Sequence, residues 1–497
     1  MSNLNFVKNH KKLFFLFFVL IQIFQNSFVF SQETNYSGVY RYALENGLEL
    51  FVAENSAAPL VYIEIAVRAG AVSHTKETAG LFHLYEHMLF KGNAKYSNQV
   101  EFTEAMNKLG VSDYNGTTGL DRVNYFFTIP SSKVKEGLEF WSYAVRTPKL
   151  DENELENEKK VVLSEIEADF SNPSKIRSSG LMKALFPACP WRLDPGGNPD
   201  VVKNASVSDL KKMQQTFYVP ENSAIFVGGD VHHEEVFKYV KEIFGDWKKS
   251  ENPVPDYGVP SKNPVEKTEK YVFVNSGNSD SIISAGLYLR GPDGEENAGE
   301  TYAADVWSNM VSNPSGEFAK LLVSEKSLEI PDSDYVSGFY STRRASAITG
   351  ISAAMLSSVG LNPVEKSEKF LSVIDEKLVP LMTDKNRFFD ENTLKSVVQQ
   401  LGDSRIYELE SAAALVSGIS SVWSSVNADY FFSYDENIAK VTEDDVVSFV
   451  KNYIEGKNGV YLVSVSPGIW QKYKSDFEKA GYKEITAENA FWITERK

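Results

Sequence analysis

The sequence predicts an α+β protein made of two homologous repeats, each a mixed or antiparallel sheet with helices packed on one face. Three observations lead to this expectation. Apolar stretches of period-two alternation are interleaved with long amphipathic helical patterns. A Pro-rich stretch divides the chain near its middle, and the two halves repeat the same order of patterns. A length of 497 residues also fits two to four domains at about 150 residues each.

Several stretches within the halves have recognisable patterns. Residues 60–68 alternate apolar and polar side chains, and residues 281–289 show a similar strand pattern in the second half. Residues 125–129 form an apolar strand that ends at a proline. Residues 152–170 form a strongly charged helix with a narrow apolar seam. This order favours sheets with helices on one face.

The ends of the two halves show the repeat most clearly. A helical pattern over 206–217 leads to Tyr218 and an apolar strand, and a helical pattern over 441–452 leads to Tyr453 and another. A shift of 235 positions superposes the two tyrosines. Chance similarity between two α+β segments is the alternative explanation.

The dividing stretch covers residues 252–269 and holds four of the 19 prolines among polar residues. Such a composition is typical of an extended, semi-rigid linker. It separates a predicted N-terminal domain, 33–250, from a predicted C-terminal domain, 270–497.

The N-terminus has the pattern of a secretory signal peptide. Three lysines precede an apolar run at 13–24, and small residues follow it near Ser31. We expect cleavage after Ser31, removing residues 1–31, and a periplasmic or otherwise exported mature protein. An uncleaved membrane anchor is the alternative, although the run is short for a stable membrane span.

The formal net charge is −16, and loss of residues 1–31 with their three lysines makes it −19. A field of that sign repels phosphate backbones and anionic lipid headgroups. Nucleic acid and membrane surfaces are therefore poor candidate partners. Stable membrane insertion is not expected because no second apolar segment of spanning length appears in the sequence. Cys189 is the only cysteine, which excludes a disulfide within the chain.

The segment Gly80–Gly92 contains His83, Glu86 and His87, in a chain with only six histidines. Residues three and four apart share one face of a helix. Two imidazoles so placed can hold one Zn²⁺ while the carboxylate reaches the water on the metal. H-x-x-E-H is the inverzincin form of the zinc-peptidase signature. Incidental polar residues on a helix face are the alternative.

A catalytic zinc usually takes three protein ligands, so one more must come from elsewhere. His74 lies on the loop before the motif, and His232 and His233 lie far along the chain. Glu158 and Glu165 are seven residues apart, two turns along one face of the acidic helix. One could bind zinc while the other anchors a histidine ring. A solvated charged face is the alternative for this pair.

The motif at Gly80–Gly92, together with Glu158, Val161-Val162 and Glu165-Ile166, resembles the pitrilysin/insulinase metallopeptidases. The strand and loop before the motif, 67–70, and the repeated halves extend the resemblance over nearly the whole mature chain. It is most similar to the two-domain branch that includes the mitochondrial processing peptidase and its bacterial relatives.

The resemblance implies one Zn²⁺ per chain, bound by His83, His87 and Glu165. Glu86 would be the general base, accepting a proton as water attacks the scissile carbonyl. Glu158 would support the site from outside the ligand shell. Peptides would be the substrates.

The stretch Asn115, Gly116, Thr117 and Thr118 resembles the edge strand on which the family binds substrate by strand addition. A turn built around Asn-Gly is the local alternative.

The second half has lost the motif. A shift of 223 positions places the two histidines and the glutamate on Val306, Met310 and Asn309. None of these can hold a metal, so this half is expected to serve as structure and chamber wall.

Active single-chain members of the family carry an Arg and a Tyr, seven residues apart, in the C-terminal half. The corresponding positions here are Leu322 or Val323, followed by Glu329 or Ile330. Nearby, Tyr335 and Arg343 occur in the wrong order. The resemblance therefore suggests a heterodimer whose same-fold partner supplies Arg and Tyr, with a homodimer as the alternative.

The expected function is that of an exported zinc endopeptidase acting on peptides or unfolded segments, as the catalytic subunit of a two-subunit clamshell. A non-catalytic assembly or core subunit of the same fold is the main alternative. Metal-dependent hydrolysis of a non-peptide substrate is a third possibility.

Overall fold

The computed structural model describes residues 32–33, 38–255, 265–389, 391–408 and 410–493. The predicted signal peptide, 1–31, and the middle of the predicted linker, 256–264, lie outside the described residues. Within the described ranges, we find no helix with both the length and the hydrophobicity that a membrane span requires.

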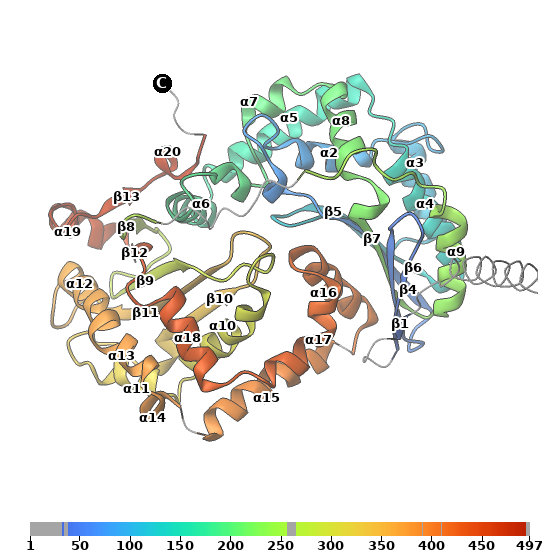
Figure 1. Ribbon diagram of the computed structural model, residues 1–497. Helices are drawn as coiled ribbons and strands as arrows, with labels where there is room; N and C mark the ends of the chain where they lie inside the picture. Colours follow the sequence, from blue (N-terminus) through green and yellow to red (C-terminus); the bar gives the residue numbers. More distant parts are fainter. Residues whose placement is uncertain (1–31, 34–37, 256–264, 390, 409, 494–497) are drawn as a thin grey trace, which may run out of the picture.

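Two mixed sheets form the framework, as Figure 1 shows. The first has the strand order β1-β2-β3-β7-β4-β6-β5 and the second β10-β11-β9-β12-β8-β13. The strands of the first sheet are Gln32–Glu33, Val39–Ala43, Glu49–Glu54, Leu60–Val67, Asp113–Thr118, Val123–Pro130 and Ser223–Gly229 for β1 to β7. Those of the second are Glu269–Val274, Ile282–Arg290, Val336–Ser341, Ile348–Leu356, Val460–Val465 and Lys483–Ile485 for β8 to β13.

The two sheets share a five-strand core, so the predicted repeat is confirmed. The order β3-β7-β4-β6-β5 in the first sheet matches β8-β12-β9-β11-β10 in the second. Within each core, the first pair, β3 with β7 and β8 with β12, is parallel and the others are antiparallel. The strand predicted at 60–68 is β4, and its predicted counterpart at 281–289 is β9.

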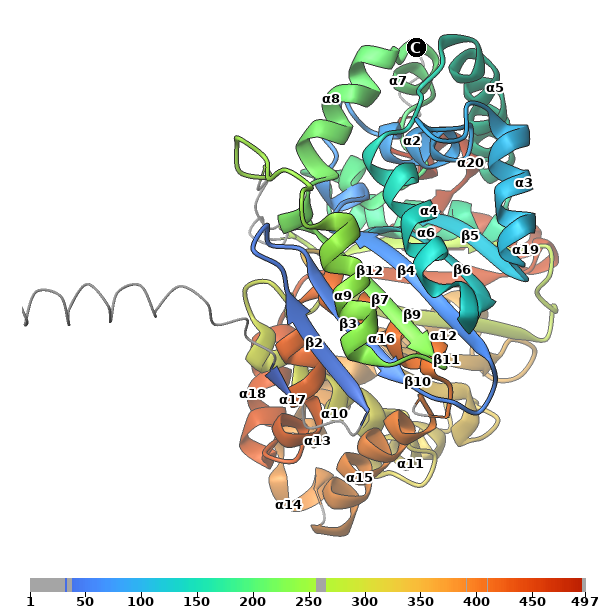
Figure 2. The ribbon, with the colours of Figure 1, turned by 90° about the vertical axis from the view of Figure 1, so that its right-hand side faces the viewer.

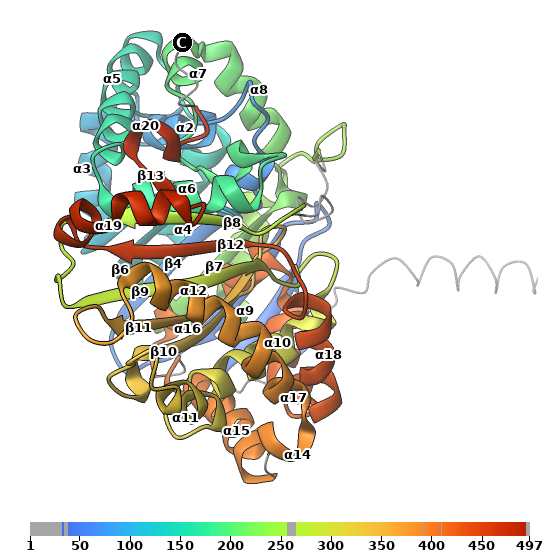
Figure 3. The same ribbon diagram turned by 90° about the vertical axis from the view of Figure 1, so that its left-hand side faces the viewer.

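Helices pack on the outer face of each sheet. Figure 2 shows α4 and α9 in front of the first sheet, and Figure 3 shows α12 and α19 in front of the second. The helices of the first half, α2 to α9, are Leu81–Leu89, Gln99–Leu109, Val134–Arg146, Glu152–Asp169, Pro173–Leu185, Pro199–Asn204, Val207–Phe217 and His233–Phe244. Those of the second half, α10 to α20, are Ala298–Val311, Glu317–Ser324, Pro363–Val373, Val379–Thr383, Lys385–Phe388, Glu391–Glu408, Ala412–Ser425, Ala428–Ile438, Glu443–Tyr453, Pro467–Lys479 and Ala487–Ala490.

The opposite face of each sheet is covered by a helix from the other half. Helix α16 packs on β3, β4 and β7, and its Leu415, Val416 and Ile419 share an apolar cluster with residues of those strands. Helix α6 packs in the same way on β9, β12 and β13, with Leu181 and Leu185 buried. Each half thus contributes one helix that packs on the sheet of the other half. The hydrophobic periodicity and composition of the sequence did not predict this packing.

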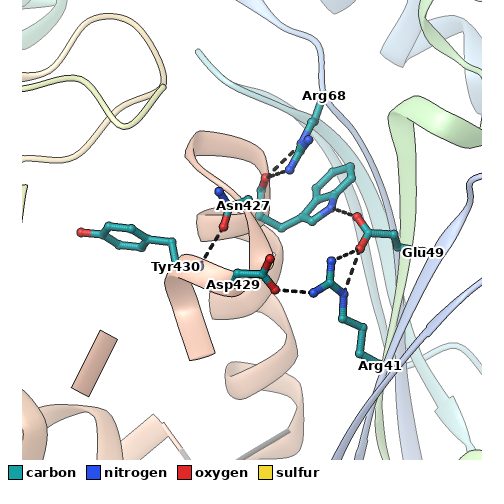
Figure 4. Close-up of polar contacts among 7 residues, drawn as sticks. Arg41, Glu49, Arg68, Asn427, Asp429 and Tyr430 are labelled. Carbon is teal, nitrogen blue, oxygen red and sulfur yellow. Dashed lines mark hydrogen bonds and ion pairs between the residues drawn. The ribbon is translucent and has the colours of Figure 1, made fainter. Parts of the chain in front are cut away.

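Polar contacts hold α16 and α17 against the first sheet (Figure 4). The Arg68 guanidinium donates to the backbone oxygen of Trp423 at 2.6 Å and stacks 4.4 Å from the centre of its ring. The indole nitrogen of Trp423 donates to Glu49 at 2.6 Å. Arg41 joins Glu49 to Asp429 of α17, at 2.7 and 2.5 Å. Burial lowers the pKa of Arg68 to about 10, so the guanidinium stays charged at neutral pH.

Candidate metal centre

Helix α2 carries the motif, and the residue that precedes it, the N-cap Gly80, has a φ of 100°. A Cβ at this position would lie 2.8 Å from the Val202 side chain and 2.9 Å from the Gly196 carbonyl oxygen. Glycine therefore meets both the backbone conformation and the close approach. The inner face of α2 is buried through Leu84 and Met88.

His83 and His87 lie on the outer face of α2, with ring centres 4.9 Å apart. Helix α5 brings Glu165 to them, and its apolar seam, buried at Val162 and Ile166, fixes α5 on the domain. The Glu165 Oε2 atom lies 3.4 Å from His83 Nε2 and 3.6 Å from His87 Nε2. The structure thus brings the three predicted ligands together.

These three atoms suit a zinc ion. In a tetrahedral site with bonds of 2.0–2.1 Å, ligand atoms are separated by about 3.4 Å. The observed separations of 3.4 and 3.6 Å are close to that value. Two imidazoles and one carboxylate are also a donor set of catalytic zinc. Within the described part of the chain, His83, His87 and Glu165 form the group that could hold a metal ion.

Both the exposure and the charge of the cluster favour metal binding. The Glu165 side chain is 48% exposed, which leaves the site open on one side. Burial, followed by the neighbouring His87 and then Lys175, lowers the pKa of His83 to about 4. The imidazole is therefore neutral near pH 7, the form in which histidine binds metals.

Glu158 anchors one of the histidines from behind. Its Oε2 lies 3.1 Å from His87 Nδ1, and its Oε1 lies 2.7 Å from the Lys91 ammonium. A proton on His87 Nδ1 leaves Nε2 free to face Glu165. The contact of Lys91 was not predicted, because Lys91 lies in the turn after α2, beyond the last helical residue Leu89.

Glu86 points to the other side of the cluster, toward strand β5. It is 9% exposed and accepts a hydrogen bond of 2.7 Å from the Thr118 hydroxyl. Burial raises the pKa of Glu86, against the lowering effect of the Thr118 hydrogen bond. The backbone of β5 is so close that a Cβ on Gly116 would lie 3.0 Å from Glu86 Cγ.

The alternative of a turn at Asn115-Gly116 is wrong. All four residues, Asn115, Gly116, Thr117 and Thr118, lie in β5, the edge strand of the first sheet. β5 pairs only with β6, so its other edge is unpaired within the sheet.

His74 and His233 have other partners, and His232 lies away from the cluster at the start of α9. His74 is 1% exposed and lies 3.4 Å from the Trp191 carbonyl, and its Nε2 accepts from the Gly80 amide. His233 stacks on Tyr40 with ring centres 3.4 Å apart. His232 precedes α9, at its N-cap.

The counterpart of the motif in the second half lies on α10 and is apolar. Val306 and Met310 are 0% and 2% exposed and belong to the core of that half. Asn309 donates to the backbone oxygen of Asp305 in its own helix.

The positions at which the resemblance would place an Arg and a Tyr hold Leu322 or Val323 and Glu329 or Ile330. Leu322 is fully buried, and Glu329 pairs with Lys366 at 3.1 Å. Tyr335 is 40% exposed and lies just before β10, and Arg343 follows that strand.

Two repeats and, among the described residues, one His-His-Glu cluster are the features expected of a two-repeat metallopeptidase. Comparison with protein families agrees. The model of insulinase (peptidase family M16) matches residues 50–190, and that of the peptidase M16 inactive domain matches residues 204–386. The chain therefore belongs to peptidase family M16. The boundary between the two matches lies upstream of the predicted linker, so the predicted domain limits remain a prediction.

Individual relatives are distant. The zinc protease PqqE of Helicobacter pylori is 26% identical over 215 residues, covering 43% of this chain and 48% of the relative. The mitochondrial-processing peptidase subunit beta of Dictyostelium discoideum is 24% identical over 208 residues, covering 42% and 44%. These matches span about half the length of the curated relatives.

Among solved structures, the first half of the periplasmic protease PqqL from Escherichia coli has the same fold. Its TM-score is 0.67 at 14% identity, with 89% of this chain and 94% of that chain covered.

Proposed function

We propose that the protein is an exported zinc-dependent endopeptidase that hydrolyses peptides or unfolded polypeptide segments. The observation that carries the proposal is the convergence of His83, His87 and Glu165 beside the buried carboxylate of Glu86. Membership of peptidase family M16 supports it.

In the proposed mechanism, His83, His87 and Glu165 hold one Zn²⁺ per chain, and Glu158 fixes the orientation of the His87 ring. A zinc ion in such a site polarises water and the scissile carbonyl. Glu86 accepts the proton of the attacking water and then returns it to the leaving amine.

Substrate binding is proposed at the unpaired edge of β5. A peptide in extended conformation could add there as a further strand, beside Asn115, Gly116, Thr117 and Thr118. The short distance between the Gly116 backbone and Glu86 would bring its peptide bonds close to the base.

Export is proposed from the signal-peptide pattern at residues 1–31. The similarity to PqqL, described as a periplasmic protease, agrees with it. Because the Arg and Tyr positions of the second half hold Leu322 and Glu329 or their neighbours, we further propose a two-subunit clamshell. A same-fold partner would supply Arg and Tyr, and a homodimer is the alternative.

A peptidase assay on the purified, zinc-loaded chain tests this function, using an unfolded protein and short peptides as substrates. We expect cleavage that a chelator abolishes and added Zn²⁺ restores. Stimulation by a co-purifying same-fold subunit would support the heterodimer, whereas full activity without it would remove that requirement. The absence of cleavage both with and without the partner would contradict the proposed function.

A further inference from the structure

Glu64 is a fully buried carboxylate in the middle of the first sheet, 0% exposed. It lies on β4 between Tyr62 and Ala66, which belong to the apolar cluster under α16. Because alternate residues of a strand share one face, Glu64 faces the same helix. A carboxylate in apolar surroundings is costly unless it is fully hydrogen-bonded.

Four side chains satisfy this carboxylate. Its Oε2 accepts from the Tyr62 hydroxyl at 2.7 Å, and its Oε1 accepts from Asn124 at 2.9 Å and from the Ser420 hydroxyl at 2.5 Å. Arg122 lies 3.4 Å from Oε1 and donates to Ser420 at 2.7 Å. Three of the four belong to the first half, and Ser420 belongs to α16 of the second.

The same cluster extends to strand β5. The side-chain amide of Asn124 donates a hydrogen bond to Glu64. The oxygen of the same amide accepts a hydrogen bond from the Thr117 hydroxyl. Thr118, the next residue, donates to Glu86. Since successive side chains point to opposite faces of a strand, these two threonines hold β5 from both sides.

The turn after β5 is also attached to the second half. Asp121 is 4% exposed, and its Oδ2 accepts from the Ser425 hydroxyl at 3.1 Å and from the Arg344 amide at 3.3 Å. Both donors lie beyond the predicted linker. An edge strand is held by only one ladder of backbone hydrogen bonds. Side-chain contacts such as these therefore contribute strongly to fixing where β5 lies.

We propose that Ser420 is a positioning residue for the catalytic site: through Glu64, Asn124 and Thr117, the docking of α16 sets the position of β5 and of the Glu86 carboxylate. The inactive half would then help to assemble the site of the active half. The catalytic meaning of this link rests on the proposed function, whereas the hydrogen-bonded path from α16 through Glu64 and Asn124 to β5 does not.

Two variants of α16 in the full chain test the proposal. Ser420→Ala removes the one donor to Glu64 that comes from α16. Ser424→Ala is the matched control, since Ser424 is also buried but donates to the Ser421 carbonyl within its own helix. Amide hydrogen exchange of residues 113–118 is measured by mass spectrometry, together with zinc content, kcat and KM.

We expect exchange in β5 to be about tenfold faster in Ser420→Ala and unchanged in Ser424→Ala, since a hydrogen bond to a charged group is lost. We also expect kcat to fall about tenfold at unchanged zinc content, because the base is displaced. Adding Ser420→Ala to Thr117→Val should produce little further change, since both interrupt one path.

Unchanged exchange in β5, or an equal increase throughout β3, β4 and β7, would overturn the proposal, the second result indicating a general loss of stability. Additive effects of Ser420→Ala and Thr117→Val on β5 exchange would also overturn it. If the unmodified chain shows no peptidase activity either alone or with a same-fold partner, the proposed function fails, and the exchange measurement still decides the positioning role.

Discussion

Helices α2 and α10 occupy equivalent places in the two repeats, but their outward surroundings differ. On α2, the side chains of His83 and His87 retain 21% and 18% exposure beside Glu165. On α10, Val306 and Met310 are packed into the core. The fold therefore does not require the motif, since apolar side chains serve the scaffold equally well. The proposed zinc centre depends on one helix face being left uncovered and on α5 supplying a carboxylate.

The largest expected effect comes from making the face of α2 resemble that of α10. His83→Ala removes one of two imidazoles, so zinc should be lost and peptidase activity should fall by more than the factor of about 10²–10⁴ typical of a lost general base. Metal analysis after dialysis and a peptide assay measure both. Retention of one zinc per chain would contradict the assignment of this ligand.

The reverse change should not create a second site. Val306→His with Met310→His places two imidazoles in a packed core, where each unpaired polar group costs about 1–3 kcal/mol. We expect a lower free energy of unfolding in denaturant titrations and a zinc content of one per chain. Two zinc ions per chain would show that the helix alone, without a counterpart of Glu165, makes a site.

A smaller effect is expected from the support behind the ligands. Glu158→Gln keeps the side-chain shape but removes the charge that faces His87 and Lys91, so zinc affinity should fall by about 10–100-fold. Competition with a chelator measures the affinity, and Glu156→Gln, on the exposed side of α5, is the control. Equal zinc affinities in the two variants would contradict a role for Glu158 in supporting the zinc ligands.

Much of this arrangement could be predicted from the sequence because it depends on local pattern. The alternation at 60–68 is β4, the charged pattern at 152–170 is α5 at Glu152–Asp169, and the H-x-x-E-H spacing places both histidines on one face. The spacing of Glu158 and Glu165 likewise put both on one side of their helix. In each case the period of the element determines which side chains lie together.

The contacts that could not be predicted are those between distant elements. Nothing in the local pattern of 412–425 indicates that α16 covers the first sheet instead of the second sheet, which belongs to the same half of the chain as α16. The hydrogen bond of Thr118 to Glu86 was missed for the same reason, since it depends on how β5 lies against α2. Asn115-Gly116, a common turn pair, lies within β5 because pairing with β6 outweighs the local preference.

Glu86→Gln, assayed for both zinc content and peptide cleavage, tests the central claim most directly. The account predicts one zinc per chain, as in the unmodified protein, with cleavage reduced by about 10²–10⁴-fold, since the amide cannot accept the proton. Cleavage at the unmodified rate by a zinc-loaded Glu86→Gln preparation would contradict it.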